Sequence, residues 1–465
     1  MQSTVSRLDW LTFQRLATAL LFLAIGLGAC FAPAQNDTWW QLRTGQDIWN
    51  TRSIDLSDHF SHTANGAYWP NHEWLSQVLF YAIYRIGGLR LLTAVVASLI
   101  VGAWVLIWRL SPGDRSLRLI LCALALVPSS SAWSLRPQVL TLFLLALTAF
   151  LIVRRWYLLM PPVFLLWANL HGGVTLGFPL LAGWIAALVV EQRKLPMRAL
   201  AIAGLCFLAT AMTPLGVSLW TEVPATLART RPYGIQEWRP PALTELRFIP
   251  FWLLAGALVV LVIRKRPWQA ASRAGPLIWT ALAILPLAVA SERNIPPFLL
   301  MAVPAVAAMG DWRLESLLQT SGRIERPAVN AGILLAGVLL AAGTIAYAWS
   351  SETPRLGWHP LRADAIAALA SCPERLYNRY DEGGYLIWFV PNRKVFIDSR
   401  QDPYPSTLVR DQIRVEASGD FAELFDRYAI GCAFVAADSP IAVRLMAGGW
   451  QNAYKGSGWM VLTRN

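Results

Sequence analysis

Long apolar runs alternate with short polar segments along most of the chain. A membrane-spanning helix needs roughly 17–25 mostly apolar residues, or somewhat fewer when aromatic and basic residues flank its ends. By this measure the pattern predicts a helical polytopic membrane protein with about eleven spans. The predicted spans lie near residues 12–32, 89–109, 117–134, 137–153, 156–170, 174–190, 198–214, 248–264, 276–291, 294–310 and 328–349.

Three longer polar regions interrupt this pattern, over residues 33–88, 214–247 and 351–465. The last region alternates helix-like text ("PLRADAIAALASC", "DFAELFDRYAI") with β-like runs ("YLIWFV", "KVFIDS", "CAFVAA", "WMVLTR"). We therefore predict a transmembrane domain over residues 1–350, which carries the first two regions as external loops, and a small external α/β domain over 351–465.

The composition agrees with a membrane protein, because 55% of residues are hydrophobic, only 15% are charged and the mean hydropathy is +0.43. The 23 tryptophans suit the headgroup region. The net charge of +12 does not indicate nucleic-acid binding, because the basic residues form short clusters between apolar runs, as at 264–266. By the positive-inside rule these clusters place the N-terminus in the cytoplasm, and an odd number of spans then places the tail outside.

Asp37 is the first candidate catalytic residue, because it follows the first predicted span directly, in "NDTWWQLRTGQDIW". One interpretation is a helix N-cap, in which Asn36 or Asp37 satisfies free backbone N–H groups. The other is a general base held at headgroup depth because its substrate is a lipid. Arg43, in the same run, is a candidate substrate-binding residue.

The rest of the first loop is rich in protonatable groups. His72 and Glu73 are candidates for binding substrate or, with Asp37, a metal, although adjacent helical residues point in different directions. A hydrogen-bonded pair that only anchors the loop is the alternative. The segment 73–86 is amphipathic, as expected of a helix lying on a membrane surface.

Polar residues also occur at three predicted external turns. Arg136 and Arg293 are candidates for holding a phosphate, which a planar guanidinium binds through two hydrogen bonds. Snorkelling to the headgroups is the alternative for each arginine. His171, before two glycines, either contacts substrate or makes a structural hydrogen bond between helices. Glu237, in the second loop, contributes to a mixed-charge surface.

The sequence contains no phosphate-binding glycine loop, no GxSxG and no CxxC pair, so ATP-driven chemistry is not supported. Three of the five cysteines lie in predicted spans, as small apolar fillers. Cys372 and Cys432 lie in the external tail, where a disulfide is permitted.

An acid directly after the first span, a long first external loop, many spans and an external C-terminal domain together resemble the GT-C superfamily of membrane glycosyltransferases. The segments "DTWWQLRTGQDIW", "NHEWLSQVLFY", "RPQVLTL", "WANLHGG" and "YNRYDEGGYLIWFVPNRKVFIDSR" resemble bacterial integral membrane proteins of this type. Many relatives have two neighbouring acids at the position of Asp37, whereas here the neighbour is Asn36.

The resemblance implies transfer of a sugar from a polyprenyl phosphate or pyrophosphate carrier to an extracytoplasmic glycan, lipid or protein acceptor. Asp37 would be the general base or acceptor-orienting carboxylate of an inverting enzyme in a bacterial inner membrane. No cofactor is implied with certainty, and a divalent cation is a candidate.

Two other functions remain open. A transporter or flippase for a lipid or polysaccharide would use similar spans, and prolines at 161–162, 286 and 304 favour broken helices. A non-catalytic envelope scaffold would use the tail alone. In the tail, Asp381, Asp398, Arg400 and Asp402 either bind an acceptor or stabilise turns.

Overall fold

The computed structural model describes residues 10–230, 236–268, 274–310, 325–372 and 375–464. Residues 231–235 of the predicted second loop therefore lie outside the described residues. The chain divides into two compact units. The first comprises Met1–Ala32, Arg90–Met212 and Gln236–Thr353, and the second comprises Pro33–Leu89, Thr213–Ile235 and Pro354–Asn465.

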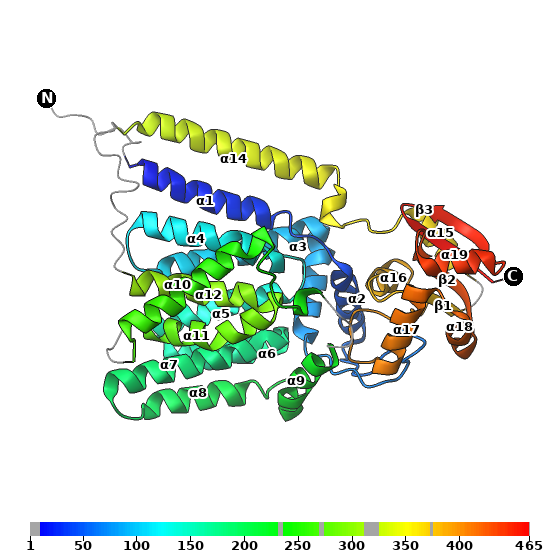
Figure 1. Ribbon diagram of the computed structural model, residues 1–465, viewed down its shortest axis with the longest axis horizontal. Coiled ribbons are helices and arrows are strands. Elements are labelled where there is room, and N and C mark those ends of the chain that lie inside the picture. The colour runs from blue at the N-terminus through cyan, green and yellow to red at the C-terminus, as the bar shows by residue number, and fades with distance from the viewer. Residues whose placement is uncertain (1–9, 231–235, 269–273, 311–324, 373–374, 465) are drawn as a thin grey trace. The chain divides into compact units, whose positions relative to one another are not determined.

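The first unit is built from apolar helices, and each of the eleven predicted ranges contains one. These helices are α1 (Phe13–Ala29), the second half of α3 (Trp74–Leu110), α4 (Arg115–Ser129), α5 (Gln138–Val153), α6 (Met160–Leu170), α7 (Gly177–Gln192), α8 (Met197–Ala209), α10 (Ile249–Lys265), α11 (Gly275–Ala290), α12 (Ile295–Met309) and α14 (Pro327–Ser350). Within this unit α14 lies beside α1, and α7 beside α11 (Figure 1).

Within the described part of the chain, five helical stretches are long and apolar enough to cross a membrane. They cover Trp74–Leu110, Arg115–Ala132, Gly172–Gln192, Leu246–Lys265 and Pro327–Ser350. This number of long apolar helices is that of a multi-pass membrane protein. The count of about eleven crossings, the cytoplasmic N-terminus and the external tail stay predictions.

The second unit combines the first loop with the C-terminal tail. Its elements are α2 (Asn36–Thr51), the first half of α3, α9 (Leu219–Thr230), α15 (Ala363–Ala370), β1 (Arg375–Asn378), α16 (Gly383–Phe389), α17 (Ser406–Ser418), α18 (Ala422–Tyr428), β2 (Ile430–Ala436), α19 (Pro440–Ala447), β3 (Gln451–Gly456) and β4 (Trp459–Thr463). The strand order is β1-β2-β4-β3, with β1 parallel to β2 and the other pairs antiparallel.

The α/β character predicted for the tail is correct, but two of its four predicted strands are wrong. The run "YLIWFV" lies mostly in helix α16, because a short apolar run buried on more than one side suits a helix as well as a strand. The run "KVFIDS" forms no strand; Val395 instead makes an isolated bridge to Ser61. β2 and β4 were predicted correctly, whereas β1, which is short, and β3, which is largely exposed, were not.

One apolar core joins segments of the second unit that lie more than 300 residues apart in the sequence. Trp40, Phe60 and Trp69 of the first loop pack with Leu376 of β1 and Phe434 of β2. The predicted boundary at residue 351 stays untested as a domain boundary, but residues 33–89 share their core with the tail.

A buried ion cluster fixes the same two segments. The side chains of Arg400 and Asp58 are both 0% exposed and form an ion pair, and Arg400 Nη2 also lies 2.7 Å from Asp398 Oδ2. The guanidinium packs over the rings of Trp69 and Phe60, at 4.6 and 5.0 Å. These contacts give Asp398 and Arg400 a structural role, although they join the tail to the first loop rather than stabilise a turn as predicted; acceptor binding by these residues stays a prediction.

Arg400→Gln should destabilise the second unit strongly, because two buried carboxylates would lose their cation. Breaking a buried pair from one side costs about 3–5 kcal/mol. The expected result is a large fall in the melting temperature of the detergent-purified chain, or loss of folded protein. Arg410→Gln, which removes an exposed arginine of α17, is the matched control and should melt like the wild type.

Candidate active site

Asp37 lies in the first turn of α2, where its side chain meets the tail within the second unit. The hydroxyl of Ser399 donates a hydrogen bond to Asp37 Oδ1, and Trp40 Nε1 lies 3.3 Å from the same oxygen. Trp40 Nε1 also lies 3.1 Å from Ser399 Oγ. The Asp37 carboxylate is half-buried and oriented by side chains from two distant parts of the sequence.

The interpretation of Asp37 as a helix N-cap is wrong. Helix α2 begins at Asn36, and Gln35 is its N-cap residue. Thr38 completes the start of the helix, since its hydroxyl accepts a hydrogen bond of 3.0 Å from the Gln35 backbone N–H. Acidic residues in the first turn of a helix interact favourably with the helix dipole, so Asp37 suits this position without serving as the cap.

The glycine pair of the tail lets α16 approach the start of α2. A Cβ added to Gly384 would lie 2.2 Å from the carbonyl oxygen of Asn36, and one on Gly383 would lie 2.2 Å from the carbonyl oxygen of Ile397. Asn36 then bonds the tail through Nδ2, at 3.2 Å from the Tyr380 carbonyl and 2.9 Å from Ser399 Oγ. The "DEGG" segment therefore builds a contact between two helices beside Asp37.

Two further acids of the tail, Asp381 and Glu382, have raised pKa values. Burial raises the pKa of Asp381, with Arg379 opposing and the charge of Asp37 adding to the shift. Burial also raises the pKa of Glu382 to about 7, despite its ion pair with Arg379 at 2.6 Å. The site thus holds a second carboxyl group, Asp381, that responds electrostatically to Asp37.

Sequence reasoning did not select Ser399. It named Asp381 only within a group of tail acids. Ser399 and Asp381 both lie in the distinctive segment that runs from "YDEGG" to "FIDSR". No periodicity along the chain links that segment to residue 37, so the sequence does not predict their contact with Asp37.

The other candidates of the first loop make contacts that position α2. Gln41 of α2 donates a hydrogen bond to Glu73, and His72 Nε2 lies 3.8 Å from Glu73 Oε1. Arg43 pairs with Asp47 one turn along the same helix, at 3.1 Å. These contacts agree with the structural interpretation of His72 and Glu73, and they leave a substrate-binding role for the three residues a prediction.

Arg136 and Arg293 come together within the first unit, although 157 positions separate them. Both guanidinium groups bond the same carboxylate, that of Glu237: Arg136 Nη2 lies 3.2 Å from Oε2, and Arg293 bonds Oε1. Arg293 also packs over the ring of Trp238, at 4.9 Å. Burial opposes ionisation of Glu237, but Arg293 and Arg136 outweigh it and lower its pKa to about 2.

His171 lies in a hydrogen-bonded contact between helices of the first unit. Its Nδ1 lies 2.7 Å from the hydroxyl of Thr141 and accepts a 3.0 Å hydrogen bond from the Gly173 backbone N–H. Trp167 Nε1 bonds the same hydroxyl at 2.9 Å. The ring is buried, and these contacts agree with the structural interpretation of His171.

The candidate metal site is not supported by a ligand cluster. Among the described residues, no group of three or more His, Cys, Asp or Glu side chains could hold a metal ion. The predicted set of Asp37, His72 and Glu73 does not form such a group, and the need for a divalent cation stays untested.

Comparison with known proteins identifies the fold. No family model and no curated protein matches the sequence. The oligosaccharyltransferase of Archaeoglobus fulgidus is similar in structure. The structure with a tethered acceptor peptide that contains the NVT sequon gives a TM-score of 0.59 at 13% identity. The structure of the apo form gives a TM-score of 0.58 at 11% identity. Each match covers 92% of this chain and 70% of that chain.

A third structure, the archaeal oligosaccharyltransferase AglB from Archaeoglobus fulgidus in complex with an inhibitory peptide and a dolichol-phosphate, gives a TM-score of 0.61 at 12% identity. It covers 91% of this chain and 69% of that chain. Oligosaccharyltransferases of this kind are membrane glycosyltransferases of the GT-C superfamily. The chain therefore has a GT-C-like fold, as the sequence resemblance predicted.

Glu237→Gln should lower the melting temperature of the purified protein, because two guanidinium groups would lose their shared anion. Leaving such partly buried groups without their partner costs about 1–3 kcal/mol. Since the folded pKa of Glu237 lies below the ordinary value of 4.5, its contribution is complete above pH 4.5 and is lost as pH falls towards 2.

The difference in melting temperature between wild type and Glu237→Gln should accordingly stay constant from pH 8 to 5 and shrink below 4.5. Glu352→Gln, which changes a more exposed carboxylate of the same unit, is the control. A difference between wild type and Glu237→Gln that grows with acidity would contradict the ion-pair assignment.

Proposed function

We propose that this protein is a membrane glycosyltransferase that transfers a sugar from a polyprenyl-phosphate-linked donor to an extracytoplasmic acceptor. The observation that supports it best is a GT-C-like fold over nearly the whole chain, together with an oriented carboxylate in the first turn of α2. One of the similar structures contains a dolichol-phosphate and another a tethered acceptor peptide. Lipid-linked donors are already activated, so an enzyme of this kind needs no nucleotide site.

In this proposal Asp37 is the general base or acceptor-orienting carboxylate. The carboxylate takes the proton of the acceptor's nucleophilic group as that group attacks the anomeric carbon of the sugar. Ser399 and Trp40 hold the carboxylate by hydrogen bonds, and such fixed geometry is what proton transfer requires. The attack breaks the bond between the anomeric carbon and the carrier phosphate, whose oxygen keeps the electron pair, and it inverts the anomeric configuration.

Arg136 and Arg293 are proposed to bind the phosphate of the lipid-linked donor. The two guanidinium groups and Glu237 together carry a net charge of +1, so the cluster attracts an anion. A phosphate entering this cluster replaces or joins Glu237 as the partner of the two arginines. Bidentate pairing with guanidinium groups suits phosphate oxygens in particular.

The first test of this proposal is Asp37→Asn in the native host, because the amide cannot accept the proton. The variant should reach the membrane at normal level but lose the same envelope glycan as a deletion strain, as measured by mass spectrometry. Asp55→Asn, which changes a more exposed carboxylate of the same loop, should keep that glycan.

Full glycosylation in the Asp37→Asn strain, with loss in the deletion strain, would refute the role of Asp37. If the deletion strain itself changes no glycan, transfer is the wrong activity, and a transporter or an envelope scaffold explains the chain better.

The phosphate-binding role has a separate test. Native mass spectrometry of the purified chain should detect bound polyprenyl phosphate in the wild type and about tenfold less in Arg136→Gln and Arg293→Gln, since each loses a charge-assisted pair. Arg154→Gln removes an equal charge elsewhere in the first unit and should bind like the wild type. Equal binding by all four proteins would rule out the arginine cluster as the phosphate site.

A further inference from the structure

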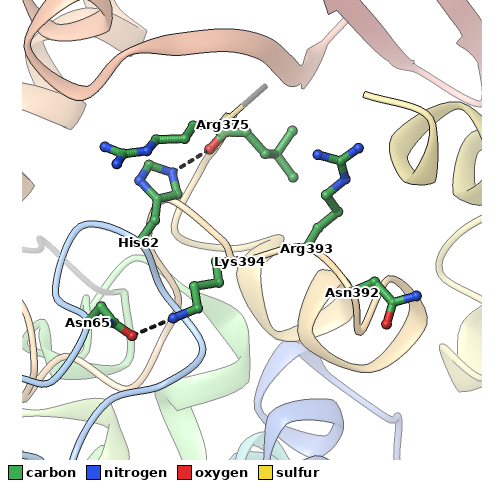
Figure 2. A pocket seen from close by; sticks show the side chains of 7 residues that line it. His62, Asn65, Arg375, Asn392, Arg393 and Lys394 are labelled. Carbon is green, nitrogen blue, oxygen red and sulfur yellow. Dashed lines mark hydrogen bonds between the residues drawn. The ribbon is translucent and has the colours of Figure 1, made fainter. Parts of the chain in front are cut away.

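A basic cavity of about 510 Å³ opens on the second unit, away from the contacts of Asp37. Its lining contains His62 and Asn65 of the first loop, Arg375 and Leu376 at the start of β1, and residues 392–394 after α16. Figure 2 shows these side chains grouped around the open space. The side chains therefore come from three separate stretches of the sequence.

Among the described residues, the lining of the cavity contains three cationic side chains and no carboxylate. Arg375, Arg393 and Lys394 contribute the charges, and Asn65 and Asn392 contribute amides. Hydrogen bonds to neutral oxygens orient these cations: Arg393 bonds the Ala370 carbonyl at 3.0 Å, Arg375 the Tyr428 carbonyl at 3.3 Å, and Lys394 the side-chain amide oxygen of Asn65.

The pKa of His62 is lowered, as expected for a group in a positively charged cavity. Burial lowers the pKa of His62, and the charges of Arg375 and Lys394 lower it further, although its hydrogen bond to the Leu376 carbonyl opposes the change. The imidazole is thus favoured as a neutral group, and its Nε2 bonds the Leu376 carbonyl at 2.9 Å. This arrangement differs from the Arg136–Glu237–Arg293 cluster, where one carboxylate offsets half the positive charge.

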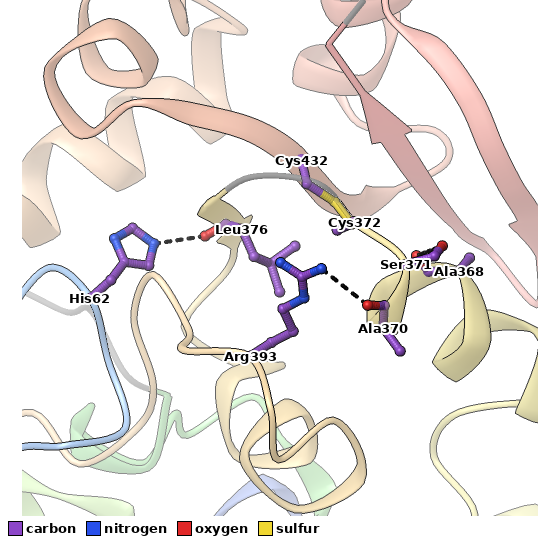
Figure 3. Close-up of a disulfide and its surroundings, with 8 residues drawn as sticks. All are labelled: His62, Ala368, Ala370, Ser371, Cys372, Leu376, Arg393 and Cys432. Atoms are coloured by element: carbon purple, nitrogen blue, oxygen red, sulfur yellow. Dashed lines mark hydrogen bonds between the residues drawn. A yellow bond between two sulfur atoms is a disulfide. The ribbon is translucent and has the colours of Figure 1, made fainter.

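A disulfide lies beside the residues that line the cavity (Figure 3). Cys372 at the end of α15 is bonded to Cys432 of β2, with the two Cα atoms 5.9 Å apart. Figure 3 shows the bond beside the Arg393–Ala370 and His62–Leu376 contacts. The disulfide that the sequence permitted is therefore present, and it crosslinks the segment that carries Ala370 to the strand beside β1.

We propose that this cavity binds an anionic saccharide, bearing phosphate or carboxylate groups, as part of the acceptor. Arg and Lys side chains recognise the anionic groups, while the amides of Asn65 and Asn392 suit sugar hydroxyls. Leu376 is the one apolar residue among the described residues of the lining, so the cavity does not suit an acyl chain or an apolar peptide side chain. The assignment to the acceptor rests on the proposed glycosyltransferase function, whereas the binding itself does not.

Binding is tested first, on the full-length chain in detergent, with glucose 6-phosphate, glucuronic acid, glucose and inorganic phosphate as probes. Isothermal titration should show that both anionic sugars bind more tightly than glucose or phosphate alone, and that added salt weakens the binding. The double variant Arg375→Gln/Arg393→Gln should weaken binding of the anionic sugars by about tenfold or more.

Two controls separate charge from folding. Arg393→Lys should keep much of the binding because it keeps the charge, and Arg410→Gln should bind like the wild type. If the wild-type protein does not bind the anionic sugars, or binds inorganic phosphate as tightly as it binds them, the cavity is not a saccharide site. Binding to phosphatidylglycerol vesicles that the double variant loses, without sugar binding, would assign the cavity to a lipid headgroup instead.

The assignment to the acceptor is tested in the host by comparing the double variant with Asp37→Asn. Reduced glycan in the double variant, with unchanged protein level, supports it. Normal glycan in the double variant, together with complete loss in Asp37→Asn, would overturn the acceptor role while leaving the glycosyltransferase function standing. No glycan change in the deletion strain would instead refute the function itself.

Discussion

The buried ion cluster of Asp58, Asp398 and Arg400 is the constraint on which the second unit depends. Burying charges is costly, so the cluster persists only where each group has a partner of opposite charge and further hydrogen bonds. Tyr404 supplies one of these, since its hydroxyl donates to Asp398 at 2.6 Å. Because Ser399 lies between two members of the cluster, the same interaction that joins the first loop to the tail also fixes the hydroxyl that bonds Asp37.

Close backbone contact between helices α16 and α2 is the second constraint on the position of Asp37. Helix α16 can reach the start of α2 only because Gly384 has no side chain, and the approach allows Asn36 to bond both Tyr380 and Ser399. A similar contact occurs further along α2, where a Cβ on Gly45 would lie 2.1 Å from the Gln77 carbonyl. Helix α2 is therefore held at two places by glycine contacts, which gives Asp37 the fixed position that a general base needs.

The cations of the chain are used in three different ways. Arg400 is buried and fully balanced by carboxylates, so it serves stability. Arg136 and Arg293 share the carboxylate of Glu237 and keep a net positive charge. Arg375, Arg393 and Lys394 line an open cavity that has no acid among its described lining residues. The degree of charge compensation, rather than the residue type, distinguishes a structural arginine from one suited to bind an anion.

The sequence by itself determined the features that depend on local patterns. Apolar runs of helical length predicted where the helices of the first unit lie. The resemblance that includes the segment around Asp37 predicted the GT-C-like fold. Hydrophobic patterning could not decide the conformation of "YLIWFV", because a short buried run suits a helix or a strand equally.

Only the tertiary structure decided which distant side chains meet. It brought Ser399 to Asp37, Glu237 to Arg136 and Arg293, and the first loop to the cavity beside β1. These contacts join residues tens to hundreds of positions apart through buried polar bonds and glycine approaches, and no periodicity along the chain encodes them.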